Sequence, residues 1–238
     1  MAKPKILVTR RWPAAVEAQL SESFDTVLNG ADTPLGPADF KAAAAMQMEK
    51  VQTKIIANYG VGFSHIDVAA AHGLGITVTN TPDVLSECTA DLAMTLLLMV
   101  ARRAGEGERE IREGRWTGWR PTHLIGTKVS GKTLGIIGFG RIGQEMARRA
   151  HHGFGMKIIV QNRSKVAPDV LARCNATQVA DIETLMPQCD FVSLHCPGGA
   201  ENRNMINTAR LELMKPDAFL INTARGEVIN ELALSQAL

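Results

Sequence analysis

The most informative segment of this 238-residue chain is Thr133-Leu134-Gly135-Ile136-Ile137-Gly138-Phe139-Gly140-Arg141-Ile142-Gly143. An apolar run leads into the spacing Gly-x-Gly-x-x-Gly, a helical stretch follows through His152, and a further strand-like run begins at Lys157. In such a unit the first glycine permits a tight turn, the second lets the backbone approach a pyrophosphate, and the third allows close packing of helix on strand. The N-terminus of the helix offers N–H groups to an anion. The stretch predicts a dinucleotide-binding unit, and the alternative is a structural glycine turn in another α/β protein.

On both sides of this unit short β-branched runs alternate with helical stretches, which predicts an α/β protein with parallel sheets. Strands are expected at 5–9, 24–28, 54–57, 76–79, 133–137, 157–161, 191–195 and 218–222, with a short one near Gln178. Helices are expected at 13–20, 42–54, 66–72, 86–103, 141–152, 181–186, 208–214 and 229–237, and Gly105 and Gly107 weaken the long one before a charged helical piece that runs through Arg112. A boundary between two lobes is expected near residues 101–105, which gives lobes 1–103 and 104–238.

The composition excludes several classes of protein. Hydrophobic residues make up 45% and charged residues 21%, as in ordinary globular domains, and the net charge of +2 is too small for a general nucleic-acid or membrane field. The apolar stretch 92–101 is too short to span a bilayer, and no leader precedes the first strand-like run. We expect a cytoplasmic protein without a metal site and with reduced thiols, because no C-x-x-C pair occurs among Cys88, Cys174, Cys189 and Cys196.

The turn after the strand 157–161 bears on the choice of cofactor. An acidic residue is expected about 20 positions after the glycines, where it binds the adenosine ribose. Here Asn162, Arg163, Ser164 and Lys165 follow the strand, and the next acid is Asp169. Basic and hydroxyl side chains suit a 2′-phosphate. We therefore expect NADP(H) in preference to NAD(H), and the alternative is a solvated basic turn.

Two further strand ends are expected at the same edge, because ligands of open α/β sheets bind outside the carboxyl ends of strands. They are His195-Cys196-Pro197 and Asn222-Thr223-Ala224-Arg225-Gly226. An arginine directly after a buried strand is placed to hold a carboxylate or to polarise a carbonyl. Arg225 is the candidate catalytic residue, and the alternative is a structural ion pair.

Together these segments resemble the D-isomer-specific 2-hydroxyacid dehydrogenase family. The resemblance extends to Asn58-Tyr59-Gly60-Val61-Gly62-Phe63-Ser64-His65-Ile66-Asp67 and to Thr81-Pro82-Asp83-Val84-Leu85. Gly114-Arg115-Trp116-Thr117-Gly118-Trp119 is similar to the glyoxylate/hydroxypyruvate reductase branch. The resemblance implies two Rossmann-like lobes: a flavodoxin-like substrate lobe at 1–103 and a dinucleotide-binding lobe at 104–238 that is incomplete at its C-terminal end.

The resemblance also implies roles for single residues. The N–H groups of Val61 and Gly62 would bind the substrate carboxylate, and Arg225 would bind the substrate and polarise its C2 carbonyl. Trp119 would reach a substrate pocket, in its own subunit or the partner's, although packing at a domain junction is an equal alternative for Trp116 and Trp119. Contacts to the cofactor are implied for Thr89, Gly138, Gly140, Arg141, Ile142, Gly143, Asn162, Arg163, Ser164, Cys196, Pro197, Thr223 and Ala224.

The expected function is hydride transfer between NADP(H) and a small 2-oxo or 2-hydroxy acid such as glyoxylate or hydroxypyruvate, in a homodimer paired through 86–103. Family members continue past the equivalent of Leu238 with a strand that carries an Asp, a Glu and the general-acid His. None of the six histidines here stands in that context, so a protein that ends at Leu238 is expected to be poorly soluble or nearly inactive. The alternative is a non-catalytic, corepressor-like dinucleotide-binding protein or an inactive fragment.

Overall fold

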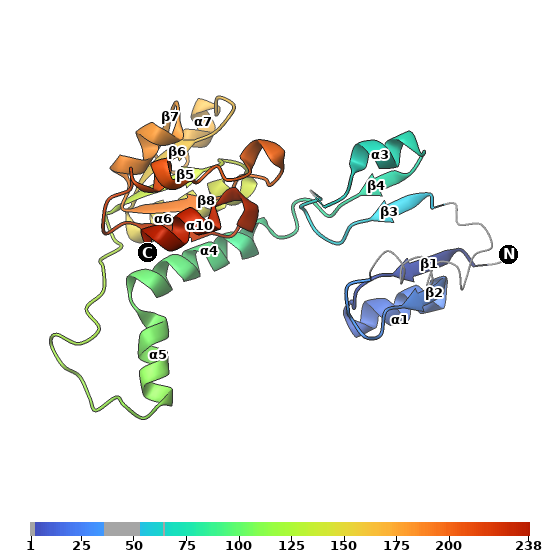
Figure 1. The fold of residues 1–238 in the computed structure, drawn as a ribbon, viewed down its shortest axis with the longest axis horizontal. Coiled ribbons are helices and arrows are strands. Elements are labelled where there is room, and N and C mark those ends of the chain that lie inside the picture. The colour runs from blue at the N-terminus through green and yellow to red at the C-terminus, as the bar shows by residue number, and fades with distance from the viewer. Residues whose placement is uncertain (1–2, 36–52, 64) are drawn as a thin grey trace. The chain divides into compact units, whose positions relative to one another are not determined.

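The computed structural model describes residues 3–35, 53–63 and 65–238 (Figure 1). Its internal contacts divide the chain into two compact units, one made of 1–56 with 69–78 and the other of 57–68 with 79–238. The helix expected over 42–54 lies outside the described residues except for its last two positions, which are not helical.

The first unit begins with a strand–helix–strand unit. β1 (Lys5–Val8) and β2 (Asp25–Leu28) pair in parallel, with Lys5 opposite Asp25, and α1 (Ala14–Ser23) connects them. A second pair of strands consists of β3 (Ile55–Ala57) and β4 (Thr77–Thr79), and α3 (Val68–Gly73) lies between them in the sequence. These elements confirm the strands and helices predicted in this region.

The second unit is built on a five-stranded parallel sheet in the order β7-β6-β5-β8-β9. Its strands are β5 (Thr133–Ile137), β6 (Lys157–Gln161), β7 (Ala176–Val179), β8 (Phe191–Leu194) and β9 (Phe219–Asn222). Within this sheet the chain forms β5 first, then β6 and β7 on one side of it, and finally β8 and β9 on the other side. The order therefore reverses between β5 and β8, and ligands of doubly wound sheets bind at such a switch point.

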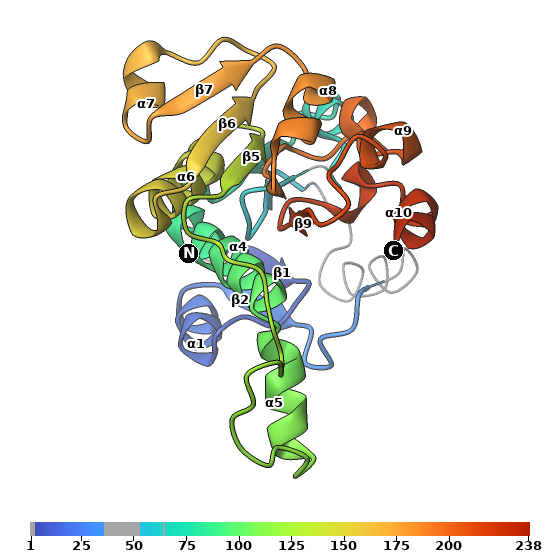
Figure 2. The same ribbon diagram turned by 90° about the vertical axis from the view of Figure 1, so that its left-hand side faces the viewer.

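Helices cover both faces of this sheet (Figure 2). One face packs against α4 (Ser86–Ala101) and α6 (Arg141–Phe154), and the other against α8 (Ile182–Leu185), α9 (Thr208–Leu211) and α10 (Glu231–Ala237). Every residue of β8 is buried, as expected of a strand covered on both faces. Sequence analysis missed α7 (Pro168–Ala172), although a proline in its first turn is a helix-start signal. The helix predicted over 181–186 ends at Leu185, and 3₁₀ turns follow at Met186–Gln188, Ala200–Asn202 and Gly226–Val228.

The long helix predicted from Ser86 differs from the prediction in two respects. It ends at Ala101 because Arg103 is left-handed (φ 55°) and the Thr127 N–H donates to the Ala101 carbonyl at 2.7 Å. The next helix, α5 (Ala104–Arg112), contains both glycines that were expected to weaken the first. The contacts also assign α4 to the second unit, because its buried face packs on α6. A division at residue 103 would place α4 in the first lobe instead. The substrate and dinucleotide roles of the two lobes stay predictions.

Among the described residues, none of the helices combines the length and the hydrophobicity of a membrane span. In the same ranges none of the four cysteines forms a disulfide, and no group of three His, Cys, Asp or Glu side chains is arranged to hold a metal ion.

The close packing around Gly135 in β5 predicts how a substitution there changes the free energy of unfolding. A Cβ at Gly135 in β5 would lie 2.5 Å from Leu185 Cδ2 and 2.6 Å from Cys189 Sγ. Gly135→Ala should therefore lower the free energy of unfolding by about 1–3 kcal/mol through overpacking. Gly153→Ala in α6 is the matched control, since its Cβ would meet no atom within 4 Å; it should be neutral or stabilising by about 0.5–1 kcal/mol. Urea titrations measure both, and an unchanged stability of Gly135→Ala would contradict the packing.

Candidate dinucleotide and substrate site

The glycine-rich turn after β5 lies directly against the loop after β8. Gly138 has φ 91°, and a Cβ there would lie 2.6 Å from the Cys196 nitrogen and 2.7 Å from the His195 carbonyl carbon. Both the left-handed backbone and the close approach require glycine. The predicted turn and the predicted His195-Cys196 strand end are thus brought together at the switch point of the sheet.

The other two glycines of the motif leave the helix N-terminus open. A Cβ at Gly143 would overlap the Gly138 carbonyl oxygen, so α6 packs tightly on the turn. A Cβ at Gly140 would meet no atom within 4 Å, and no side chain caps this end of α6. The open space in front of backbone N–H groups, near Ile142 in the first turn, fits a pyrophosphate. The Arg141 side chain is not free there, because its Nε lies 2.7 Å from Asp83 Oδ1.

The turn after β6 is braced from both sides. Asn162 Oδ1 accepts the Phe139 N–H at 3.0 Å, and Asn162 Nδ2 donates to the Ser164 carbonyl at 3.0 Å. Gln178 of β7 donates to the same carbonyl at 3.1 Å. Asn162 therefore fixes the turn to the glycine-rich loop, a positioning contact that the sequence did not predict.

Arg163 lies at the tip of this turn. Its Nη1 is 2.9 Å and 3.0 Å from the two carboxylate oxygens of Glu201. A hollow of about 450 Å³ lies beside it, and its lining includes Asn162, Arg163 and Lys165. Two basic side chains thus border a hollow at the ends of β6 and β7.

The loop after β8 contributes uncharged groups. His195 Nε2 lies 2.9 Å from Ser193 Oγ, and burial lowers the pKa of this imidazole to about 4, so it is neutral at physiological pH. Burial also raises the pKa of the Cys196 thiol. Pro197 is exposed, and its carbonyl accepts from the Asn202 side chain at 2.9 Å.

The loop after β9 is held by Asn222. Its Oδ1 accepts the Ala224 N–H and its Nδ2 donates to the Arg225 carbonyl, both at 2.9 Å. Thr223 Oγ1 is buried and has no hydrogen-bond partner among the described residues. A buried hydroxyl without a partner is rare in a native structure. This orphaned group and the open space at Gly140 both fit a ligand that lies along the carboxyl edge of the sheet.

The Arg225 guanidinium lies against the backbone of Gly62. Its Nη1 donates to the Ala224 carbonyl at 2.7 Å, and a Cβ at Gly62 would overlap its Nη2. No carboxylate of the described chain forms an ion pair with it, unlike Arg141 and Arg163. Within the described residues, Arg225 therefore has no ion-pair partner.

The backbone beside Arg225 presents free donors. The Asn58 side chain donates to the Gly62 carbonyl at 3.1 Å, and the Asn80 side chain donates to the Val61 carbonyl at 2.9 Å. In the described part of the chain, the N–H groups of Val61 and Gly62 donate to no acceptor. Two free N–H groups next to a guanidinium form a site for a small carboxylate. Sequence analysis missed both asparagines, although each directly follows a predicted strand.

Two predicted site residues are not joined to this cluster by a hydrogen bond. Thr89 is half-buried in the first turn of α4. Trp119 is 83% exposed on the loop after α5, which extends away from the sheet together with that helix (Figure 2). The nearly buried Glu110 of α5 fastens this loop, since His123 Nε2 lies at 2.7 Å and Arg120 Nη2 at 3.3 Å from its carboxylate.

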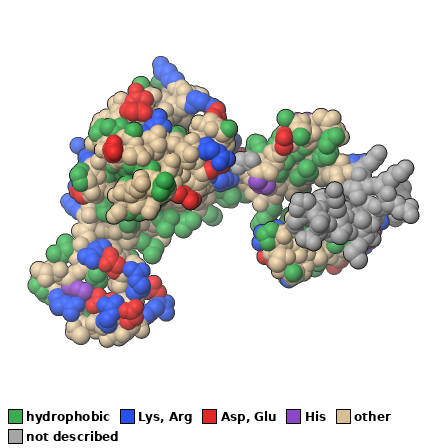
Figure 3. All heavy atoms as spheres, in the orientation of Figure 1, with side chains coloured by type: hydrophobic (Ala, Val, Ile, Leu, Met, Phe, Trp, Pro, Cys, Tyr) green, Lys and Arg blue, Asp and Glu red, His purple; other side chains and the backbone are tan. Residues whose placement is uncertain are grey.

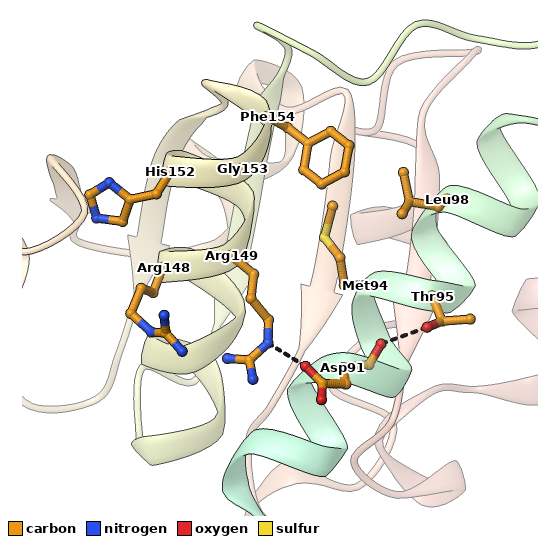
Figure 4. A pocket seen from close by; sticks show the side chains of 9 residues that line it. All are labelled: Asp91, Met94, Thr95, Leu98, Arg148, Arg149, His152, Gly153 and Phe154. Atoms are coloured by element: carbon orange, nitrogen blue, oxygen red, sulfur yellow. Dashed lines mark hydrogen bonds and ion pairs between the residues drawn. The ribbon is translucent and has the colours of Figure 1, made fainter.

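A larger hollow of about 620 Å³ lies away from the sheet edge, between α4 and α6 (Figure 4). An ion pair between Arg149 and Asp91 crosses it. Met94, Leu98 and Phe154 supply its apolar wall. The hollow belongs to the helical layer and contains none of the predicted site residues.

The parallel sheet, the glycine-rich turn and the open N-terminus of α6 define a dinucleotide-binding α/β protein. The family model of the D-isomer specific 2-hydroxyacid dehydrogenase, NAD binding domain, matches residues 94–238. The chain belongs to the D-isomer specific 2-hydroxyacid dehydrogenase family, whose members are oxidoreductases with an NAD(P)-binding domain.

Similar proteins support this assignment over the whole chain. The glyoxylate reductase of Thermococcus litoralis is 42% identical over 257 residues, which cover 99% of this chain and 76% of the relative. The glycerate dehydrogenase of Hyphomicrobium methylovorum is 37% identical and covers 99% of this chain, which spans 78% of the relative. A solved structure from Polaromonas sp. JS6 66, described as a D-isomer specific 2-hydroxyacid dehydrogenase, superposes with a TM-score of 0.90 at 35% identity and covers all of this chain and 79% of its own. Because 257 aligned positions exceed 238 residues, the Thermococcus protein has residues within the alignment that this chain lacks.

Proposed function

We propose that this chain binds NADP(H) along the carboxyl edge of the five-stranded sheet and a small 2-oxo acid at Arg225. The supported reaction is hydride transfer to glyoxylate or hydroxypyruvate. The observation that carries the proposal is the unpaired Arg225 guanidinium on Gly62, on the loop that also presents the free N–H of Val61. The names of the glyoxylate reductase and glycerate dehydrogenase relatives support the substrate class.

Different residues of the chain would bind the cofactor and the substrate. A bound nicotinamide dinucleotide supplies or accepts the hydride. The open N-terminus of α6, from Gly140 through Gly143 with Arg141 and Ile142, would hold the pyrophosphate, and Arg163 and Ser164 would hold the adenosine end. The nicotinamide half would pass the groups that line this path, which are Thr89, Cys196, Pro197, Thr223 and Ala224.

Arg225 would act on the substrate in two ways. Together with the N–H groups of Val61 and Gly62, it would hold the substrate carboxylate, and its guanidinium would stabilise the negative charge that develops on the C2 oxygen. Within the described chain no histidine hydrogen-bonds to Arg225, and His123 is paired with Glu110 on the α5 loop. The roles proposed for this chain are therefore cofactor binding, carboxylate binding and polarisation of the carbonyl.

Binding of a substrate analogue tests the assignment of Arg225. Oxalate should bind the chain saturated with NADPH, and Arg225→Ala should weaken it by about 1.5–3 kcal/mol, the usual contribution of a hydrogen bond to a charged group. Arg225→Lys should recover only part of this loss, because an ammonium cannot bind a carboxylate bidentately. Arg148→Ala on the surface of α6 removes the same charge and should have no effect. Calorimetric titration measures all four proteins; equal oxalate affinity in Arg225→Ala would favour a non-catalytic dinucleotide-binding protein.

The preference for NADP(H) rests on Arg163, Ser164 and Lys165, which stand where an acidic residue would repel a 2′-phosphate. Fluorescence titration should give tighter binding of NADPH than of NADH. Arg163→Ala should weaken NADPH by about 1.5–3 kcal/mol and leave NADH nearly unchanged. Equal affinities for the two cofactors in the unsubstituted chain would show that the preference is wrong.

We also propose that the chain forms a homodimer through α4. Its exposed apolar side chains recur at helical spacing and are Leu92, Leu96, Met99 and Val100. Figure 3 shows hydrophobic side chains along the lower border of the second unit, where α4 lies in Figure 1. Apolar stripes of this kind mark contact surfaces. Exposed Trp119 on the α5 loop would then be available to a partner subunit.

Light scattering at micromolar concentration should give twice the mass of the chain. Leu96→Glu should shift the mass to that of a monomer, because it places a charge in the apolar stripe. Leu232→Glu is the control, since that leucine is 70% exposed on α10. A monomeric unsubstituted chain would contradict the proposed dimer.

A further inference from the structure

The loop after β8 is connected by ion pairs to the turns on either side of it. At one end Glu201 pairs with Arg163, which follows β6, at 2.9 Å and 3.0 Å. At the other end Arg203 Nη2 lies 3.1 Å from Glu227 Oε2, in the segment that follows Arg225. The loop thus joins the turn after β6 to the turn after β9.

The pair between Arg163 and Glu201 spans the glycine-rich turn. In the order β7-β6-β5-β8-β9, strand β5 lies between β6 and β8. A contact between the turns that follow β6 and β8 must therefore cross the carboxyl end of β5, where Gly138–Gly143 leave the open space described above. A ligand whose pyrophosphate occupies that space meets this ion pair at its adenosine end.

The backbones that carry the two partners are fixed. On the β6 side, Asn162 and Gln178 brace the turn. On the β8 side, the Gly199 N–H donates to Glu227 Oε1 at 2.7 Å, and Asn202 Nδ2 donates to the Pro197 carbonyl at 2.9 Å. The side chains themselves are exposed, 81% for Arg163 and 62% for Glu201. Opening the pair requires only rotation of side chains.

We infer that Glu201 is a specificity-determining residue, because its carboxylate occupies the position on Arg163 that a 2′-phosphate would take. The inference rests on the proposed use of NADP(H). A phosphate monoester carries about −1.5 to −2 charges at neutral pH and binds arginine bidentately, so it displaces a single carboxylate, whereas the ribose hydroxyl of NAD(H) has no such charge. Glu201 thus lowers the affinity for NADPH selectively, and Lys165 beside Arg163 remains available to the phosphate.

The test compares cofactor affinities in Glu201→Gln with those in the unsubstituted chain. Removal of the competing carboxylate should tighten NADPH by about three- to five-fold, the scale of an exposed ion pair, and change NADH less than two-fold. Glu212→Gln is the matched control, because Glu212 is exposed and forms no ion pair among the described residues. It should leave both affinities unchanged. Fluorescence titrations of NADPH and NADH give the dissociation constants.

Arg163→Ala separates failure of the inference from failure of the proposed function. If Arg163→Ala weakens NADPH and Glu201→Gln then has no further effect in that background, competition for the guanidinium is supported. A tightening of NADPH below two-fold in Glu201→Gln, or an equal tightening of NADH, overturns the role of Glu201 alone. If Arg163→Ala leaves NADPH unchanged, the proposed 2′-phosphate site is wrong, and the inference falls with it.

Discussion

The close approach of Gly138 to the backbone of His195 and Cys196 is the constraint on which the rest of the site depends. Any side chain at Gly138 would occupy the space of the β8 loop, at 2.6 Å from the Cys196 nitrogen. Because the turn at Gly138 lies directly against the β8 loop, α6 begins at the switch point of the sheet, and Gly143 can pack on the Gly138 carbonyl. The free N–H groups of α6, the orphaned Thr223 hydroxyl and Arg225 then share one edge of the sheet.

The arginines of this edge separate into two groups by their partners. Arg141, Arg163 and Arg203 are each paired with a carboxylate, and they fasten loops to one another. Arg225 rests on the Gly62 backbone without an anionic partner among the described residues. Exposed ion pairs contribute little to stability, so a phosphate can replace a carboxylate at the first group at small cost. The charge of Arg225 is therefore the one that we propose for the substrate carboxylate.

Most strands and helices of the second unit could be predicted from the sequence, because the patterns that predict them lie within short segments. Four of its five strands are short, largely apolar runs, and the glycine spacing predicts both the turn and the start of α6 at Arg141. A break in the long helix was expected at Gly105 and Gly107, but it lies at Arg102 and Arg103. Its position depends on Thr127, which binds the Ala101 carbonyl from 26 positions away. The packing of α4 on α6 is likewise a tertiary contact, so the assignment of α4 to a unit could not be made from periodicity.

The sequence predicted which residues to consider for the site, but it did not predict which residues they contact. Arg225 is predicted from its place after a strand, and the Val61-Gly62 loop is implied by the family resemblance. Their juxtaposition and the bracing by Asn58 and Asn80 appear only in three dimensions. The same holds for Glu201, which is 38 positions from Arg163 in the sequence. Ion pairs between distant loops leave no local pattern in the sequence. The sequence therefore predicted either a phosphate or solvent beside Arg163, and not a carboxylate.

A crystal structure of the chain with NADPH would show where the dinucleotide binds. We expect the pyrophosphate at the N-terminus of α6, over the open space at Gly140, with the 2′-phosphate on Arg163 and the Glu201 carboxylate displaced from it. The nicotinamide should lie toward Thr223 and Arg225. Nucleotide bound elsewhere, for example in the hollow between α4 and α6, or bound at the edge with its phosphates away from α6, would contradict the proposed binding mode.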